Sequence, residues 1–158
     1  MHLEDYEPGA KAELGSHLFT ADEIVRFASK YDLQPFHLSE EAGLAGPFKG
    51  LAASGWHTCA VWMKLMVAFQ IRMAKDRMAA GLPVGRAGPS PGFTGLKWRA
   101  PVMAGDTITY FSEVVETRPS ASRPDWGLLK ALNTAVNQNG VEVLRFTSTA
   151  FVESRPAA

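Results

Sequence analysis

The sequence has only one cysteine among its 158 residues, and its charges balance, with 16 basic and 16 acidic residues. A single cysteine excludes an intrachain disulfide and favours a reducing, cytoplasmic location, and we expect Cys59 to be a small buried hydrophobic residue. A zero net charge argues against a general nucleic-acid binder, which would need an excess of basic residues. Local basic groups could still hold a small phosphorylated ligand.

The histidines lack the spacing of a metal site. No two of them are four residues apart, as two ligands on one helical face would be, and a lone cysteine cannot complete a set. The sequence also has no glycine-rich phosphate loop and no nucleophile elbow. We therefore expect no metal and no resident cofactor. The four histidines are His2, His17, His37 and His57.

The sequence shows neither a signal peptide nor a clear membrane span. Its first 14 residues are acidic and contain no apolar core of the kind a signal peptide needs. Residues 51–69 have the length of a membrane span, but His57 and Lys64 would be costly in lipid. We expect no membrane contact.

The longest apolar segment, residues 51–78, contains no proline and, after Gly55, no glycine. Ser54 is a good N-cap because its hydroxyl can accept a free backbone N–H of the first turn. The first half of the segment is apolar nearly all round, which is typical of a helix buried on most sides. Steps of three or four residues place seven apolar residues on one helical face: Trp56, Ala60, Met63, Val67, Ile71, Ala74 and Met78.

The chain before this helix is predicted to hold short elements. Residues 1–12 form an irregular arm in this interpretation, and residues 14–19 a short strand. A capping box at Thr20–Glu23 opens a helix that ends near Asp32, because the residue before Pro35 avoids helical geometry. A second short helix begins at Ser39.

The second half of the sequence favours strands. Residues 81–92 are dense in glycine and proline and form a loop. Asn139-Gly140 has the composition of a two-residue hairpin turn. β-branched and aromatic residues then predict strands at residues 93–99, 107–117, 126–138 and 141–153.

This order of elements predicts a single α+β domain over residues 1–158. A curled antiparallel sheet around one long helix explains both the consecutive strands and the apolar helix. The end strands of such a sheet need cover, which edge-to-edge pairing in a dimer would supply.

Two polar groups flank the start of the long helix. Asp32 and His37 lie five residues apart across a bend, and a carboxylate with an imidazole can act as a general acid and base; the alternative is a helix stop with a satisfied histidine. Gly55 has a free helix N–H that could stabilise a developing oxyanion, worth roughly 3 kcal/mol. Ser54 is either a cap or a hydrogen-bond partner of substrate or water, and His57 is interpreted as a core or supporting residue.

Four motifs together resemble the MaoC-like dehydratases, a hotdog-fold family that includes R-specific enoyl-CoA hydratases. The family's Asp-x-Asn-Pro-x-His segment corresponds to residues 32–37, DLQPFH, and its Phe-x-Gly approach to residues 48–50, FKG. Its His-Gly helix start corresponds to Ser54-Gly55, and its RPV-x-x-GD strand entry to residues 99–106, RAPVMAGD. The resemblance covers residues 14–153.

The resemblance implies a hotdog fold, usually dimeric or of higher order, and hydration of a trans-2-enoyl-CoA to a 3-hydroxyacyl-CoA, or the reverse dehydration. Asp32 and His37 would activate one water, and the Gly55 N–H would polarise the thioester carbonyl. Coenzyme A would arrive with the substrate. Ser54, Trp56 and Phe48 are the candidate substrate-binding residues, with a core role as the alternative for the two aromatic residues.

Two departures from the family pattern concern the bracing of the helix start: Gln34 replaces an asparagine, and Ser54 replaces a histidine. The rival interpretations are a hotdog acyl-CoA thioesterase and a hotdog protein that binds an acyl thioester or a partner without chemistry. The sequence leaves open the acyl chain, and whether coenzyme A or a carrier protein holds it.

Overall fold

A five-stranded antiparallel sheet and one long helix dominate the computed structural model, which describes residues 1–156. The strand order is β1-β3-β4-β5-β2, so that β1 and β2 are the edges. In chain order the elements are the 3-10 helix η1 (Leu3–Asp5), β1 (Lys11–Leu18), α1 (Ala21–Tyr31), the 3-10 helix η2 (Pro35–His37), α2 (Glu40–Ala45), α3 (Gly55–Ala79), β2 (Gly92–Trp98), β3 (Thr107–Pro119), β4 (Trp126–Val136) and β5 (Glu142–Glu153).

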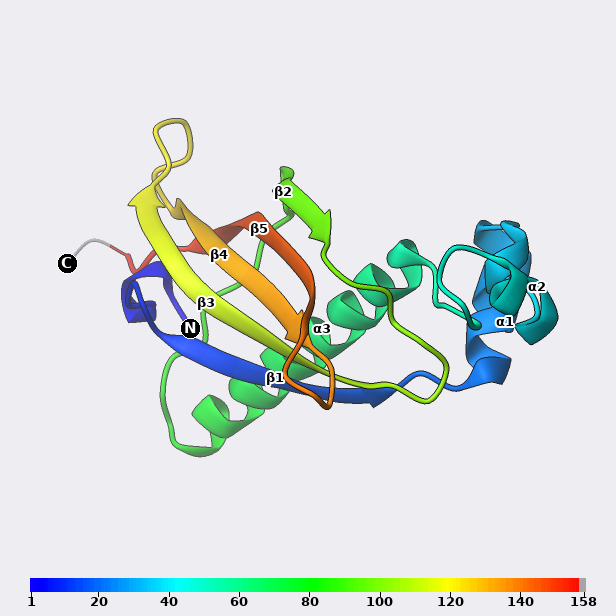
Figure 1. The fold of residues 1–158 in the computed structure, drawn as a ribbon. Coiled ribbons are helices and arrows are strands. Elements are labelled where there is room, and N and C mark those ends of the chain that lie inside the picture. Colours follow the sequence, from blue (N-terminus) through cyan, green and yellow to red (C-terminus); the bar gives the residue numbers. More distant parts are fainter. Residues whose placement is uncertain (157–158) are drawn as a thin grey trace.

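The sheet curls over one side of α3, and α1 and α2 gather beside the amino-terminal end of that helix (Figure 1). The amino terminus and the end of β5 lie at the opposite end of the molecule (Figure 1). This is the α+β hotdog arrangement that the sequence predicts, with the long helix and the four later strands close to their expected positions.

The core lies between the inner face of the sheet and the amino-terminal half of α3. Tyr110 is fully buried and faces Ala135 across the pairing of β3 with β4. Asn133, a fully buried polar side chain in this region, accepts a hydrogen bond from the Trp62 indole at 3.1 Å and donates to the Ser148 hydroxyl at 2.9 Å. A buried amide satisfied in this way stabilises the helix–sheet contact without an unpaired polar group.

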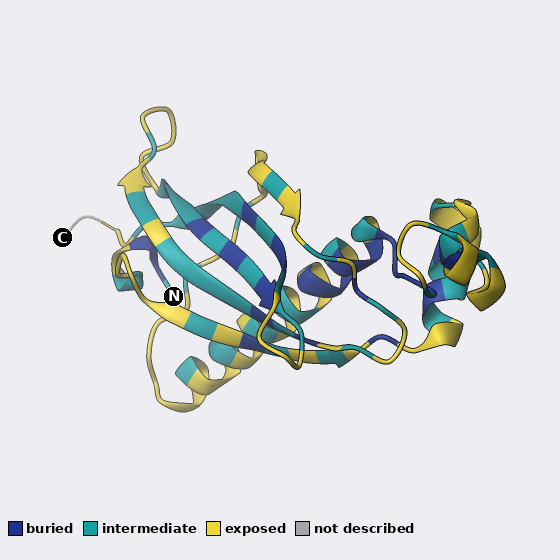
Figure 2. Cartoon of the chain, in the orientation of Figure 1, coloured by how far each residue is buried: buried dark blue, intermediate teal, exposed yellow. Residues whose placement is uncertain are grey.

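The expectation that α3 is buried on most sides is wrong for a single chain. Within the helix only His57, Thr58, Val61 and Trp62 are buried. One sheet covers only one side of a helix, and the predicted apolar face lies on the other side, as the exposed part of α3 in Figure 2 shows. The large side chains of this face are substantially exposed: Trp56 (53%), Met63 (50%), Val67 (43%), Ile71 (52%) and Met78 (68%).

The amino-terminal arm is more ordered than the sequence suggests. Residues 3–5 form η1, and β1 begins at Lys11 instead of residue 14. Leu3 is buried because its side chain packs where a Cβ on Gly127 would otherwise lie. Arg77 near the end of α3 binds Asp5 at 3.0 Å, so the arm closes the end of the fold remote from α1.

The turn between β4 and β5 also differs from the predicted two-residue hairpin. The backbone N–H of Asn137 donates to the Val141 carbonyl, so three residues, 138–140, form the loop. Of these only Gly140 has a positive φ, at 76°. The Asn137 side chain accepts from the N–H groups of Asn139 and Val141, which stabilises the longer turn.

An extended segment leads into α3 and determines where the helix begins. Ala53 N–H donates to the Val102 carbonyl at 2.8 Å, and Ala104 N–H donates to the Leu51 carbonyl at 2.9 Å. Residues 51–54 are buried as a result. The start of α3 is therefore held against the segment before β3, far from it in sequence.

Candidate active site

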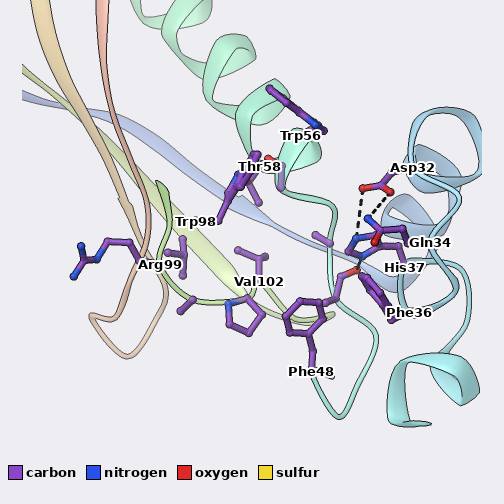
Figure 3. A pocket seen from close by; sticks show the side chains of 16 residues that line it. Asp32, Gln34, Phe36, His37, Phe48, Trp56, Thr58, Trp98, Arg99 and Val102 are labelled. Atoms are coloured by element: carbon purple, nitrogen blue, oxygen red, sulfur yellow. Dashed lines mark hydrogen bonds and ion pairs between the residues drawn. The ribbon is translucent and has the colours of Figure 1, made fainter. Parts of the chain in front are cut away.

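A cavity of about 510 Å³ opens where η2, the segment before α3, the first turn of α3 and the end of β2 meet (Figure 3). Ligand pockets usually have volumes of about 300–1,000 Å³. Five of the six predicted site residues line it, and the sixth, Ser54, is buried directly behind its wall. The five are Asp32, His37, Phe48, Gly55 and Trp56.

His37 presents one nitrogen to the backbone and the other to the cavity. Pro35 starts the short helix η2, and His37 ends it with a buried side chain. Its Nδ1 lies 2.6 Å from the Ala52 carbonyl oxygen, which can only accept, so Nδ1 carries the proton. In the neutral form of the imidazole the lone pair is therefore on Nε2, which lies 3.5 Å from Oδ2 of Asp32 (Figure 3).

Asp32 is the C-cap residue of α1, and both of its carboxylate oxygens accept hydrogen bonds. Ser54 Oγ donates to Oδ2 at 2.7 Å, and Gln34 Nε2 donates to Oδ1 at 2.9 Å. Burial opposes ionisation, but the hydrogen bonds from Ser54 and Gln34 outweigh it and hold the pKa of Asp32 below its usual range. Asp32 is therefore a carboxylate at neutral pH.

Ser54 and Gln34, the two residues that depart from the family pattern, thus both bind the Asp32 carboxylate. Ser54 also accepts the Trp56 N–H at 3.3 Å, so it caps α3 as predicted while its proton goes to Asp32. Gln34 is long enough to bend back two residues and reach the same carboxylate.

We expect the pKa of Asp32 to rise in Ser54→Ala and in Gln34→Leu, because each variant loses one bond that stabilises the charged form. The carboxyl carbon resonance of Asp32, followed by NMR during a pH titration, measures this directly. The stability that Asp32 contributes is complete above its ordinary pKa of 3.8 and is lost as the pH falls through the lower folded value, so both variants should also lose part of their stability near neutral pH.

Ser39→Ala is a matched control for the lost cap. Ser39 caps α2 in the same way, by accepting the Ala42 N–H at 3.1 Å, but does not touch Asp32. An unchanged Asp32 titration in Ser54→Ala and Gln34→Leu would contradict the assigned hydrogen bonds.

Gly55 is the first residue of α3, and its N–H has no acceptor among residues 1–156. Its carbonyl accepts two bonds, from Thr58 Oγ1 at 2.6 Å and from Trp98 Nε1 at 2.9 Å. Glycine has no side chain that would block the approach of a substrate at this residue. The structure shows instead that the Trp98 indole occupies this space, since a Cβ on Gly55 would lie 2.4 Å from Trp98 Cε2.

Aromatic side chains form the walls of the cavity. Trp56 packs edge-to-face on Trp98, with ring centres 5.4 Å apart, and Phe48 packs in the same way on Phe36 at 5.3 Å. Trp56 also borders a second cavity of about 300 Å³, whose lining is almost entirely apolar. That lining comprises Trp56, Cys59, Ala60, Trp62, Met63, Phe93, Leu96 and Phe146.

Several lining residues were not predicted individually. Trp98, Arg99 and Val102 join the cavity from segments more than 40 residues after Gly55. The motif at residues 99–106 marks this segment as part of the family pattern, but nothing in it predicts contact with the start of α3. Arg99 brings a cation to the rim, where its Nε lies 3.3 Å from Oε1 of Glu142.

Within residues 1–156, no three side chains of histidine, cysteine, aspartate or glutamate are grouped so that they could hold a metal ion. No helix in the same range combines the length and apolar character needed to cross a membrane. The absence of a metal or a resident cofactor stays a prediction.

A sheet wrapped on one helix, with a carboxylate–imidazole pair beside the free amino-terminal end of that helix, defines a hotdog-fold protein with an acid/base pocket. The family model described as the MaoC like domain matches residues 6–126, and the chain belongs to this family. The resemblance seen in the sequence is therefore confirmed.

Three relatives illustrate the similarity. The chain is 36% identical to the MaoC-like dehydratase from Rhodospirillum rubrum, with 99% of each chain covered and a TM-score of 0.82. It is 30% identical over 143 residues to the uncharacterized protein YdeM of Bacillus subtilis, covering 90% of this chain and 92% of YdeM. The R-hydratase PhaJ1 of Pseudomonas aeruginosa is 22% identical, with 98% and 86% of the chains covered and a TM-score of 0.63, and shows the shared fold.

Proposed function

We propose that this protein is a hydratase/dehydratase that interconverts a trans-2-enoyl thioester and a 3-hydroxyacyl thioester. The family supports the general class of hydratases and dehydratases. One observation carries the finer proposal: Nε2 of His37 lies 3.5 Å from Oδ2 of the ionised Asp32, while Nδ1 is bound to the Ala52 carbonyl, in the cavity that the first residue of α3 also lines.

In the hydration direction, Asp32 and His37 both accept hydrogen bonds from one water molecule. In this proposal Nε2 of a neutral imidazole and Oδ2 of the Asp32 carboxylate are both acceptors, so a water that donates to both satisfies them together. His37 removes a proton as the water oxygen forms a bond to C3 of the enoyl group. The carbon–carbon double bond breaks, its electrons form the enolate, and the pair returns a proton to C2, so one turnover leaves the protonation of the site unchanged.

The negative charge that develops on the thioester oxygen requires a donor. The Gly55 N–H is free, and the amino-terminal end of a 25-residue helix carries a partial positive charge. A preorganised donor of this kind contributes roughly 3 kcal/mol to the stability of the transition state. Thr58 and Trp98 fix the Gly55 carbonyl, which belongs to the following peptide group, and thereby limit movement of the backbone at Gly55.

An acyl-CoA substrate fits the distribution of polar and apolar surface. The apolar cavity next to Trp56 would take the acyl chain, and Phe48 would line the opposite wall beside Phe36. Arg99 at the rim offers a cation to the phosphate groups of coenzyme A. In this proposal coenzyme A is part of the substrate and no resident cofactor takes part.

A homodimer in the cytoplasm is the proposed assembly. The exposed apolar face of α3 and the unpaired edge of β2 lie next to the apolar cavity, and a second copy would cover all three. Sedimentation at micromolar concentration should show a dimer, and a stable monomer would contradict this part of the proposal.

A turnover panel of short, long and branched enoyl-CoA thioesters, followed by mass spectrometry, tests the function. Addition of one water with the thioester intact is the expected result. Release of free thiol, detected with a thiol-reactive dye, would instead identify a thioesterase. Calorimetric binding of an enoyl-CoA without turnover would identify a binding protein.

A further inference from the structure

Three titratable side chains outside the catalytic pair meet beside the start of α3. Glu23 Oε1 lies 2.6 Å from His17 Nε2 and 3.3 Å from His57 Nε2. His17 belongs to β1, Glu23 to the first turn of α1, and His57 to the first turn of α3. One carboxylate oxygen therefore joins β1 and α1, which are neighbours in the chain, to α3, which begins at residue 55.

The environment of His57 determines its protonation state. The ring is buried, stacks on Phe27 with centres 4.5 Å apart and meets the edge of Phe19 at 5.0 Å. Burial lowers the pKa of His57, and the attraction of Glu23 only partly offsets this; His17 and Arg26 are the other charged or titratable groups that act on the ring. Nε2 of the ring faces Glu23 Oε1 at 3.3 Å, and its buried Nδ1 has no partner in the described chain.

A single carboxylate oxygen of Glu23, Oε1, faces the Nε2 atoms of both histidines. Burial by itself would raise its pKa, but the hydrogen bond from His17 and the nearby imidazoles hold the pKa below its usual range. An ionised carboxylate can only accept, so His17 Nε2 donates to it, and His57 Nε2 lies against the same oxygen at the longer distance of 3.3 Å. The contact is thus a charge-assisted bridge with a defined direction.

The bridge matters because α1 carries Asp32 at its other end. Helix α1 has 11 residues, so it is about 16 Å long. Glu23 ties its first turn to His57, and Asp32 at its C-cap binds Ser54. Ser54 and His57 lie three residues apart at the start of α3, so a short rigid helix is fastened at both ends to one helical turn.

We propose that Glu23, together with His17 and His57, is a positioning residue that holds α1 against the start of α3 and so places Asp32 beside His37. Only Ile24 and Ala28 of α1 are buried, so apolar packing alone gives this helix little grip. Without the bridge, the amino-terminal end of α1 is free to tilt, and the Asp32 carboxylate moves relative to Ser54 and His37. The catalytic consequence rests on the proposed hydratase function.

Glu23→Ala and Glu23→Gln test the proposal, with Asp22→Ala as the matched control. The alanine variant removes the bridge, whereas glutamine retains an oxygen that can face both histidines. Asp22 lies on the same helical turn but is exposed. We expect Glu23→Ala to lower kcat by about 10- to 100-fold at a temperature where it is folded, because displacements of about 1 Å have effects of this size. Glu23→Gln should restore most of kcat, and Asp22→Ala should match the wild type.

The NMR titration of Asp32 supplies a readout that does not depend on activity. In Glu23→Ala the pKa of Asp32 should rise toward the value in Ser54→Ala, because the displaced carboxylate loses the Ser54 bond. If the wild-type protein does not hydrate enoyl thioesters, the proposed function is overturned. The Asp32 titration would still decide the positioning role. A Glu23→Ala variant with lower thermal stability but an unchanged Asp32 pKa and unchanged kcat would overturn the positioning role and leave the function intact.

Discussion

Hydration of the enoyl thioester should fall by about 10²- to 10⁴-fold in both Asp32→Asn and His37→Ala, since general acid–base groups contribute effects of this size. Asparagine keeps the shape of Asp32 and can still bind Gln34 and Ser54, so the main loss is the negative charge that orients water. Alanine removes the Nε2 acceptor of His37 altogether. The kcat of each variant, compared with wild type under the same conditions, gives the effect.

Two controls separate chemistry from folding in this experiment. Asp22→Asn removes a carboxylate from the same helix at an exposed position and should retain full activity. Thermal unfolding should show that Asp32→Asn remains folded, because asparagine can still form hydrogen bonds with Gln34 and Ser54. Near wild-type rates in both active-site variants would exclude the Asp32–His37 pair as the catalytic centre.

Gly55→Ala should lower activity by about 10²-fold, although alanine is the better helix former by roughly 1 kcal/mol. The new methyl group would lie 2.4–2.7 Å from three atoms of the Trp98 indole, which is rigid and must move. This movement breaks the Trp98 bond to the Gly55 carbonyl and shifts the backbone of Gly55, the residue that also carries the free N–H. The expected result is therefore lower kcat and lower stability.

The Trp98→Ala/Gly55→Ala double variant provides the control. Removal of the indole removes the clash, so adding Gly55→Ala to Trp98→Ala should cost much less than adding it to wild type. Such non-additivity is the mark of residues in direct contact. If Gly55→Ala is instead more stable than wild type with unchanged kcat, the close packing of Trp98 on the start of α3 is wrong.

Much of the fold follows from local patterns. The capping box at Thr20–Glu23, the Ser54 cap and the run free of proline and glycine correctly predict where α1 and α3 begin. The positions of β-branched and aromatic residues predict most strand ends to within two residues. Where the prediction fails, a local competitor explains the result: the Asn137 side chain stabilises a three-residue loop in place of the Asn139-Gly140 turn.

The burial of α3 illustrates a different kind of error. Apolar residues around a helix indicate that each face needs cover, but the pattern cannot distinguish cover by the same chain from cover by another. In this chain the sheet covers Val61 and Trp62, while Met63 and Ile71 are exposed. The proposed dimer accounts for the sequence pattern without changing the fold.

The candidate site, too, was predicted only in part from the sequence. Asp32, His37 and Gly55 could be selected from sequence, because their chemistry and their places at helix ends depend on neighbours within a few residues. The sequence could not show that Ser54 donates to Asp32 across 22 positions, or that Trp98 occupies the space beside Gly55 across 43. It assigned His57 to the core but did not connect it with Glu23 and His17.

The sequence by itself determined most of the elements and the family, and it selected Asp32 and His37 as the candidate acid/base pair, because local periodicity, capping and motif spacing act over short stretches of chain. Only the tertiary structure decided which groups touch: Ser54 and Gln34 on Asp32, Trp98 on Gly55, and Glu23 between His17 and His57. The physical reason is that a contact between distant segments depends on how the whole sheet packs on α3, and no local pattern specifies that packing to within the length of a hydrogen bond.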